Sequence, residues 1–255
     1  MYKGQRKINI VKYYTLPILI IIIWEVAAIA GWITPYTMPA PHKIILTAWE
    51  LIKDFSLIKD VGVSVIRVLG GFVIAAVLGI IIGVLSAISK DFELFTEFIM
   101  QVLKPIPPIA WIPIAILWFG IGETSKVFII FVGAFFPIFV NVIDGIRQIE
   151  DKYVEVATIF EVPKLKFIKK VVIPGAMPSI MTGLRIGLGN AWICVVAAEM
   201  IAATQGIGYM LMDGRSLSQP DKVILGMLMV GIIGKAMDDA LKKLEVKLIY
   251  WRTIK

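Results

Sequence analysis

Six stretches of this chain are apolar over lengths that match the hydrocarbon core of a lipid bilayer. A helix rises about 1.5 Å per residue, so roughly 20 apolar residues cross a core of about 30 Å. The stretches cover residues 16–33, about 64–88, about 95–119, 127–142, about 180–203 and about 223–241. Composition agrees, because 58% of the 255 residues are hydrophobic. The sequence therefore predicts one all-α domain over residues 1–255, a polytopic membrane bundle of about six transmembrane helices.

Lys and Arg residues are distributed unevenly between the connections. If the N-terminus lies inside, the segments on that side carry 16 of these residues and those on the opposite side carry 6. Loops rich in Lys and Arg stay on the cytoplasmic side of a membrane. The count predicts a multi-pass protein of the cell membrane with both termini in the cytoplasm. It also explains most of the net charge of +7, so we expect membrane lipid and no nucleic acid among its partners.

The sequence lacks the motifs of catalysis, nucleotide binding and metal binding. No Gly-x-x-x-x-Gly-Lys-Ser/Thr phosphate loop occurs. The one cysteine, Cys194, lies within an apolar stretch, and the one histidine, His42, lies in a connection without other metal-binding residues. We therefore expect no enzyme activity, no metal and no cofactor on this chain.

One connection, at about residues 146–179, is patterned like a docking element. Tyr153, Ala157 and Phe160 recur at helical spacing and would share one apolar face. Pro163 would stop that helix, and lysines follow it at positions 164, 166, 169 and 170. The pattern predicts a short amphipathic helix, a turn and a basic helix between the fourth and fifth spans. Such an element on the cytoplasmic side would grip a soluble partner.

Charged and amide side chains within the spans need a partner or water, because an unpaired charge in a bilayer is costly. Arg67, Arg185 and Glu199 lie near span ends, so each either forms an ion pair in the bundle or lines a pathway. Glu199 could pair with Arg67. Asn190 lies in the middle of the fifth span, which makes it the stronger pathway residue, with an interhelical hydrogen bond as the alternative.

Glycines and prolines predict how the spans pack. Gly79 and Gly83 form a Gly-x-x-x-Gly pair in the second span, and glycines recur at 183, 187 and 189 in the fifth. Such small residues let helices approach closely. Prolines at 105, 107 and 108 interrupt the third apolar stretch, so we expect a kinked or two-piece span there.

The patterned loop resembles that of the membrane permease subunits of ATP-binding-cassette (ABC) importers, which reads Glu-Ala-Ala, three residues, Gly, nine residues, Ile-x-Leu-Pro. Glu155 and Ala157 fall on the first and third positions, and Pro174 falls on the last. Glu161 replaces the glycine, and one alanine is also replaced. Without glycine, the close turn between the two helices would need another way to break the chain, such as Pro163.

Further short sequence motifs resemble those of the branch of this family that handles nitrate, aliphatic sulfonates, taurine and bicarbonate. The resemblance covers nearly the whole chain and implies the type I importer permease fold and a small, anionic solute. These motifs, in chain order, are residues 24–25 (Trp-Glu), 38–41 (Met-Pro-Ala-Pro), 105–108 (Pro-Ile-Pro-Pro), 118–122 (Trp-Phe-Gly-Ile-Gly), 174–178, 183–185 (Gly-Leu-Arg), 198–200 (Ala-Glu-Met) and 206–208 (Gly-Ile-Gly).

A permease of this kind implies several partners. They are a cytoplasmic ATPase dimer that holds ATP and Mg, an external substrate-binding protein, and a second permease copy, most simply in a homodimer. The apolar face of the loop would enter a groove on the ATPase. The ATPase-coupling loop would then contain Tyr153, Glu155, Ala157, Phe160, Glu161 and Pro174. Two other classes stay open on the residues alone: an ion-coupled secondary carrier and a membrane scaffold that does not transport.

Overall fold

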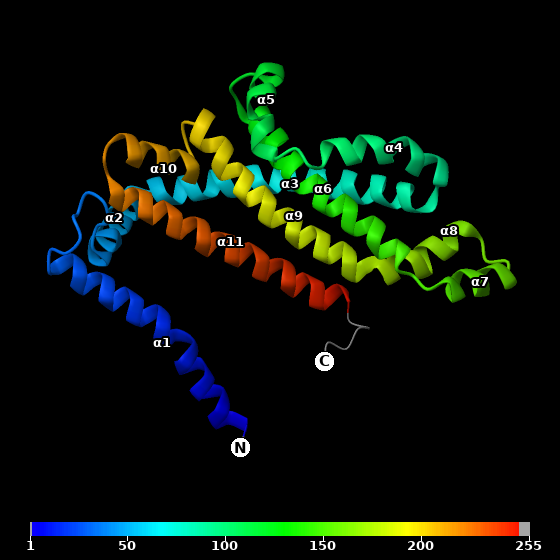
Figure 1. Ribbon diagram of the computed structural model, residues 1–255, viewed down its shortest axis with the longest axis horizontal. Coiled ribbons are helices and arrows are strands. Elements are labelled where there is room, and N and C mark those ends of the chain that lie inside the picture. The colour runs from blue at the N-terminus through cyan, green and yellow to red at the C-terminus, as the bar shows by residue number, and fades with distance from the viewer. Residues whose placement is uncertain (1, 250–255) are drawn as a thin grey trace.

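Four long helices run lengthwise through the molecule (Figure 1). They are α3 (Ser56–Ile88), α6 (Glu123–Arg147), α9 (Ile173–Ala202) and α11 (Pro220–Leu248). The computed structural model describes residues 2–249, with side chains for 15–150 and 152–249, and this part of the chain contains no strand. The all-α bundle expected from the sequence is confirmed.

Helix α6 is the centre of the bundle, because α3 packs along one side of it and α9 along another. Many of its apolar side chains fill the space between these two helices and are buried. The most buried of them are Ile129, Ile130, Ala134, Ile138 and Val142.

Glycines allow α3 and α9 to approach α6 closely. A Cβ atom at Gly79 would lie 3.0 Å from Cγ2 of Ile138, and a Cβ atom at Gly83 would lie 2.9 Å from a side chain of α6. From the other side, a Cβ atom at Gly187 would lie 2.8 Å from Cγ1 of Ile138. The close approach expected at these glycines is confirmed. The same expectation is wrong for Gly189, whose Cβ position has no described heavy atom within 4 Å.

Three helical segments are long and apolar enough to cross a membrane: Ser56–Ile88, Glu123–Arg147 and Lys164–Ala202. A fourth span results if the bent pair Lys90–Leu103 and Pro108–Phe119 counts as one, although its halves meet at 91°. The bend lies between α4 (Lys90–Leu103) and the turn η1 (Pro108–Trp111), where the prolines predicted a break. The following short helix α5 (Ile112–Phe119) protrudes from the bundle (Figure 1).

The first and last expected spans differ from their predicted limits. Helix α1 (Tyr2–Ile29) contains a shorter apolar segment, Thr15–Ile29, and ends before residue 33, in a turn where Gly31 has a φ of 74°. Helix α11 has sufficient length, but its last part is rich in charged residues and it is not among the segments with sufficient apolarity. Six spans therefore remain a prediction.

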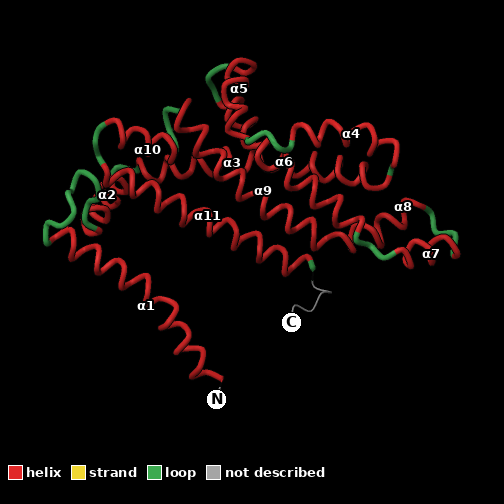
Figure 2. The backbone as a smooth tube through the Cα atoms, in the orientation of Figure 1, coloured by secondary structure: helices red, strands yellow, loops and turns green. Residues whose placement is uncertain are grey.

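Several connections lie at the two ends of the bundle, whereas those on either side of α5 lie between the ends (Figure 2). Helices α7 (Asp151–Ile159) and α8 (Lys164–Phe167) project from one end. Helices α2 (Pro41–Lys53) and α10 (Ile207–Ser216) lie at the other end (Figure 1). Helix α1 diverges from the bundle and meets α2 there, where Oε1 of Glu25 lies 2.6 Å from Nδ1 of His42.

The packing at Gly187 predicts a large effect of one methyl group. Gly187→Ala would place its Cβ atom 2.8 Å from the Ile138 side chain and 3.0 Å from the Ala134 carbonyl oxygen. We expect a loss of about 1–3 kcal/mol in the free energy of unfolding, because overpacking forces helices apart. The matched control is Gly189→Ala, which adds the same methyl group to open space and should be neutral or slightly stabilising. Unfolding in detergent micelles measures both, and equal losses would contradict this account.

Candidate functional site

The projecting loop contains a helix–turn–helix whose turn includes a residue in the left-handed backbone conformation. Glu161 follows α7 with a φ of 50°. Its amide donates a hydrogen bond to the carbonyl of Thr158 at 3.1 Å, and the amide of Val162 donates to the carbonyl of Ala157 at 2.9 Å. These two bonds form a Schellman motif, in which the left-handed residue is usually glycine. The turn therefore forms with glutamate at the position where the family pattern has glycine.

Two expectations about this loop are wrong in detail. Pro163 does not end the first helix, because α7 already ends at Ile159 and Pro163 is the N-cap of α8. The basic segment is not a separate helix either. It continues through the wide turn η2 (Ile168–Val172) into α9, so that 164–202 form one helical run of 39 residues. Pro174 lies in the first turn of α9 and has no amide hydrogen, so it interrupts the series of backbone hydrogen bonds along the helix. This interruption accounts for the wide turn before it.

The apolar side chains of the loop are uncovered. Phe160 and Ile159 are each 75% exposed, and Tyr153 is 49% exposed. Glu155 is also exposed, whereas Ala157 is partly buried. A cleft of about 500 Å³ lies at the base of the loop, lined among others by Tyr153, Lys170, Pro178 and Ser179.

The start of the loop contains an ion pair between Lys152 and Glu150. The hydrogen bond to this carboxylate is the main reason that the pKa of Lys152 is raised.

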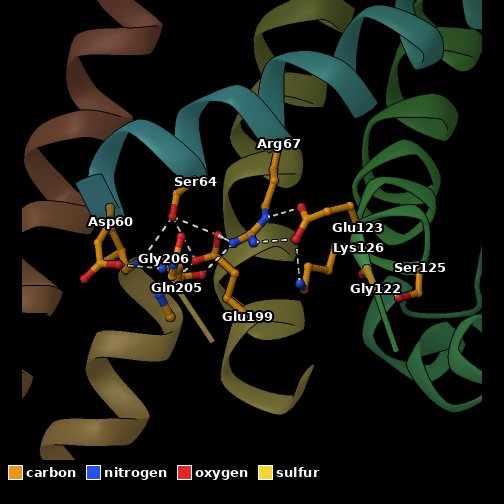
Figure 3. Close-up of polar contacts among 12 residues, drawn as sticks. Asp60, Ser64, Arg67, Gly122, Glu123, Ser125, Lys126, Glu199, Gln205 and Gly206 are labelled. Carbon is orange, nitrogen blue, oxygen red and sulfur yellow. Dashed lines mark hydrogen bonds and ion pairs between the residues drawn. The ribbon is translucent and has the colours of Figure 1, made fainter. Parts of the chain in front are cut away.

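A buried ion network lies towards the end of the bundle that carries α10 (Figure 3). Arg67 of α3 is 7% exposed, and its guanidinium donates hydrogen bonds in two directions. On one side, Nε and Nη2 donate to the two carboxylate oxygens of Glu123, each at 2.6 Å. On the other side, Nη1 donates to Oε1 of Glu199 at 2.8 Å and to the carbonyl of Gln205 at 2.7 Å. Arg67 thus joins α3, α6 and the end of α9.

Glu199 is enclosed by its partners. It is 1% exposed and accepts hydrogen bonds from the Ser64 hydroxyl at 2.8 Å and from the Gly208 amide at 2.9 Å, besides Arg67. The turn into α10 passes directly over this carboxylate. Gly206 in that turn has a φ of 123°, and any Cβ atom there would collide with the carboxylate of Glu199. Only glycine fits both the backbone conformation and the space.

Glu123 is the exposed member of the network. Its carboxylate lies between Arg67 and Lys126, whose Nζ donates to Oε1 of Glu123 at 2.9 Å. Lys126 is only 5% exposed, whereas the Glu123 side chain is 62% exposed. Two buried cations therefore hold one carboxylate at the surface of the bundle.

The other two predicted site residues lie outside this network. Arg185 donates through Nε and Nη2 to Asp238 of α11 at 2.9 and 3.1 Å, and its Nη1 lies 3.5 Å from Glu245. Asn190 is partly buried, and its side chain forms no hydrogen bond with any residue between 15 and 249 that the structure describes. The face of α9 beside it is open, since Ile193 is 61% exposed.

Sequence reasoning missed several partners of these residues. Glu123 and Lys126 fall in the connection between the expected third and fourth spans, although their spacing of three residues puts them on one face of a helix. Asp238 lay within the expected sixth span and received no role. Because an unpaired charge in lipid is costly, Arg185 within the fifth span predicts an acidic partner on a neighbouring helix.

The fold and these sites define a class: a helical membrane protein that exposes a helix–turn–helix at one end and encloses an ion network towards the other. The chain belongs to the family described as binding-protein-dependent transport system inner membrane component, which matches residues 75–238. It is therefore the membrane permease subunit of an ABC importer and not an enzyme.

Two curated relatives extend the match beyond those residues. A permease protein of Bacillus subtilis (strain 168) whose name refers to aliphatic sulfonates is 39% identical over 98% of this chain and 90% of its own length. The nitrate import permease protein of Synechococcus elongatus is 34% identical over 88% of this chain and 84% of its own length. Among solved structures, an inward-facing form of the MetNI methionine ABC transporter is similar with a TM-score of 0.63 and 17% identity, covering 79% of this chain and 97% of the matched chain. That likeness shows the fold alone.

Removing the buried charge of Glu199 should be costly. Glu199→Gln keeps the shape of the side chain but leaves Arg67 with one charged partner, so we expect a loss of about 3 kcal/mol in the free energy of unfolding. The matched control is Glu93→Gln, because Glu93 pairs with Arg147 where both side chains are partly exposed and the loss should stay below about 1 kcal/mol. Unfolding of both variants in mixed micelles tests this. Similar losses would mean that burial adds nothing to the network.

The left-handed turn predicts a stabilising substitution. Glu161→Gly should relieve strain of about 1 kcal/mol, because a residue with a Cβ atom is disfavoured at positive φ. The amides of α7 should then exchange their hydrogens about fivefold more slowly, as measured by hydrogen–deuterium exchange. Glu161→Ala is the control, since it removes the carboxylate and keeps the Cβ atom. If both variants slow exchange equally, charge rather than backbone strain limits the turn.

Proposed function

We propose that two copies of this chain form the translocation pathway of an importer for a small oxyanion. ATP and Mg would be bound by a cytoplasmic ATPase dimer, and an external binding protein would deliver the solute. The observation that carries the proposal is the uncovered apolar surface of the loop, with Phe160 and Ile159 each 75% exposed in a member of this permease family. The carrier and scaffold alternatives have no comparable support.

The docking surface consists of one face of α7 together with the turn after it. Tyr153, Ala157 and Phe160 lie on this face at helical spacing. A helix of this kind buries its apolar side chains in a groove of its partner. Glu155 and Glu161 border the surface and would orient the helix, and Pro174 would end the coupling loop in the first turn of α9. We therefore assign the ATPase contact to α7 and the turn rather than to the lysines of α8.

The pathway is assigned to the open face of α9. Asn190 presents an amide there without a hydrogen-bonding partner among the described residues, and Gly189 beside it leaves open space. An unpaired amide facing lipid would cost several kcal/mol, on the order of the penalty for a lost hydrogen bond in hydrocarbon. Water in a pathway between two copies would satisfy this amide. Arg67, Glu199 and Arg185 each form an ion pair with another helix, so they are not assigned to this face of α9.

The class of solute follows from what the relatives have in common. Their names refer to sulfonates and to nitrate. Both are anions that present oxygen atoms around one central atom, so we assign a small oxyanion to this chain. The uneven distribution of Lys and Arg supports cytoplasmic termini and a cytoplasmic loop of α7 and α8. The end that carries α2 and α10 would then face the binding protein.

Phe160→Asp tests the docking surface. A carboxylate at this position cannot enter an apolar groove, and loss of a central aromatic anchor costs at least about 2 kcal/mol of binding. We expect about thirtyfold less ATPase to co-purify with the tagged permease from its own cells, at equal membrane yield. The ATPase activity of each eluate measures this.

Thr158→Asp is the matched control. It adds the same charge to α7 on the side away from Phe160 and should retain the ATPase. Equal retention by both variants would move the docking surface away from this face. If the wild-type chain recovers no ATPase at all, the secondary carrier or the scaffold takes precedence.

A further inference from the structure

We propose that Arg67 and Lys126 form a binding site for a small oxyanion, and that the carboxylate of Glu123 occupies this site while no anion is bound. The proposal rests on the proposed function for the class of solute and for the side from which it arrives. The geometry rests on the buried network alone (Figure 3).

The Glu123 carboxylate shows what the site accepts. Its two oxygens each lie 2.6 Å from a nitrogen of Arg67, and one of them lies 2.9 Å from Nζ of Lys126. A guanidinium binds any planar pair of oxygens in this forked way. Nitrate, a carboxylate and the sulfonate group all present two oxygens on one atom at similar spacing. A free oxyanion could therefore replace the carboxylate without moving either cation.

Burial decides which partner is able to leave. Arg67 and Lys126 are 7% and 5% exposed, whereas the Glu123 side chain is 62% exposed. Arg67 is held from behind by Glu199 and by the carbonyl of Gln205. The cations are therefore fixed in the bundle, and only the Glu123 carboxylate can turn out into water without breaking the packing.

The ammonium of Lys126 has capacity for a further acceptor. An ammonium carries three donors, and the structure gives this one a single hydrogen bond, to Glu123, among the residues it describes. A buried cation with unused donors is costly unless an anion or water completes its shell. An oxyanion with three oxygens can bind Arg67 with two and leave the third for Lys126, which a carboxylate cannot do.

The charges of the site require an anion whenever Glu123 leaves. With Glu123 in place, two cations face Glu123 and Glu199, so the four charges cancel. Once Glu123 turns outward, the remaining three groups carry one net positive charge in a buried setting. Glu199 cannot be exchanged in the same way, because it is 1% exposed and held by Ser64 and Gly208. Exchange of Glu123 for an oxyanion restores neutrality.

The exchange would also release a connection between helices. Glu123 is the first residue of α6, directly after the turn that joins it to α5. Its bonds to Arg67 fasten this turn to α3. Gly120 in the turn has a φ of 75°, and no described heavy atom lies within 4 Å of its Cβ position, so this turn has space around it. An arriving anion that takes the place of Glu123 would unfasten the turn while keeping Arg67 satisfied.

Rescue of Glu123→Ala by free anions tests the site. The full-length permease is purified without its ATPase, and its unfolding temperature is measured by tryptophan fluorescence in sodium nitrate, acetate or methanesulfonate, against sodium chloride at equal ionic strength. We expect the variant to unfold at a lower temperature than wild type in chloride. We expect each oxyanion, at tenfold its dissociation constant, to raise that temperature by about 3 °C or more, with a smaller rise in wild type.

Two controls separate a site from a general salt effect. Glu93→Ala removes a carboxylate from the partly exposed pair with Arg147 and should gain no more from oxyanions than wild type. Adding Lys126→Gln to Glu123→Ala should abolish the rescue. If Glu123→Ala does not fold, Glu123→Ser, which also empties the site, takes its place in the same assay. The proposal is wrong if oxyanions do not raise the unfolding temperature of Glu123→Ala, or raise it no more than chloride does. It is also wrong if they raise that of Glu93→Ala by the same amount. Either outcome would show that Glu123 only holds the helices together. Either result leaves the ATPase test of Phe160→Asp unaffected.

Discussion

The structure depends on how closely α3 and α9 approach α6. Lipid offers no hydrophobic drive between helices, so association relies on contact between backbones and on satisfied polar groups. Gly83 on one side of α6 and Gly187 on the other present no side chain where the helices meet. This sandwich brings α3 beside both the start of α6 and the end of α9. The positions of Arg67, Glu123 and Glu199 relative to one another follow from that packing.

The ion network gains its specificity from the same packing. Taking charges out of water costs several kcal/mol per ion, so a buried cluster is tolerated only when nearly every donor and acceptor is matched. Arg67 uses four of its five donors, and Glu199 accepts from three different partners. A shift of one helix along another would leave unpaired charge in a dry interior. The network therefore fixes the register of the helices, and Glu123 at its edge is the member whose side chain is exposed.

The sequence allowed the fold class, the break at the prolines and the helix–turn–helix to be predicted, because each follows from local composition and spacing. It also suggested Glu199 as a partner of Arg67, and these groups lie 2.8 Å apart. Glu123 escaped notice because it reads as a loop residue, and its neighbours come from distant segments. The positive φ of Glu161 could not be anticipated either, since glutamate avoids this conformation unless surrounding hydrogen bonds impose it. Tertiary partners, rather than local preference, decide such positions.

The continuous run from α8 through α9 has a mechanical consequence. Helix α9 itself has 30 residues, which at about 1.5 Å per residue form a rod of about 45 Å, and the chain changes direction between α8 and α9 (Figure 1). The start of this rod follows the projecting loop, the open face at Asn190 lies part-way along it, and Glu199 lies near its far end. A displacement of the loop would therefore reach Asn190 and Glu199 through a single helix. The wide turn at Ile168–Val172 and Pro178 within α9 are points where the regular hydrogen bonding of this stretch is broken, so substitutions there would change how far such a displacement travels.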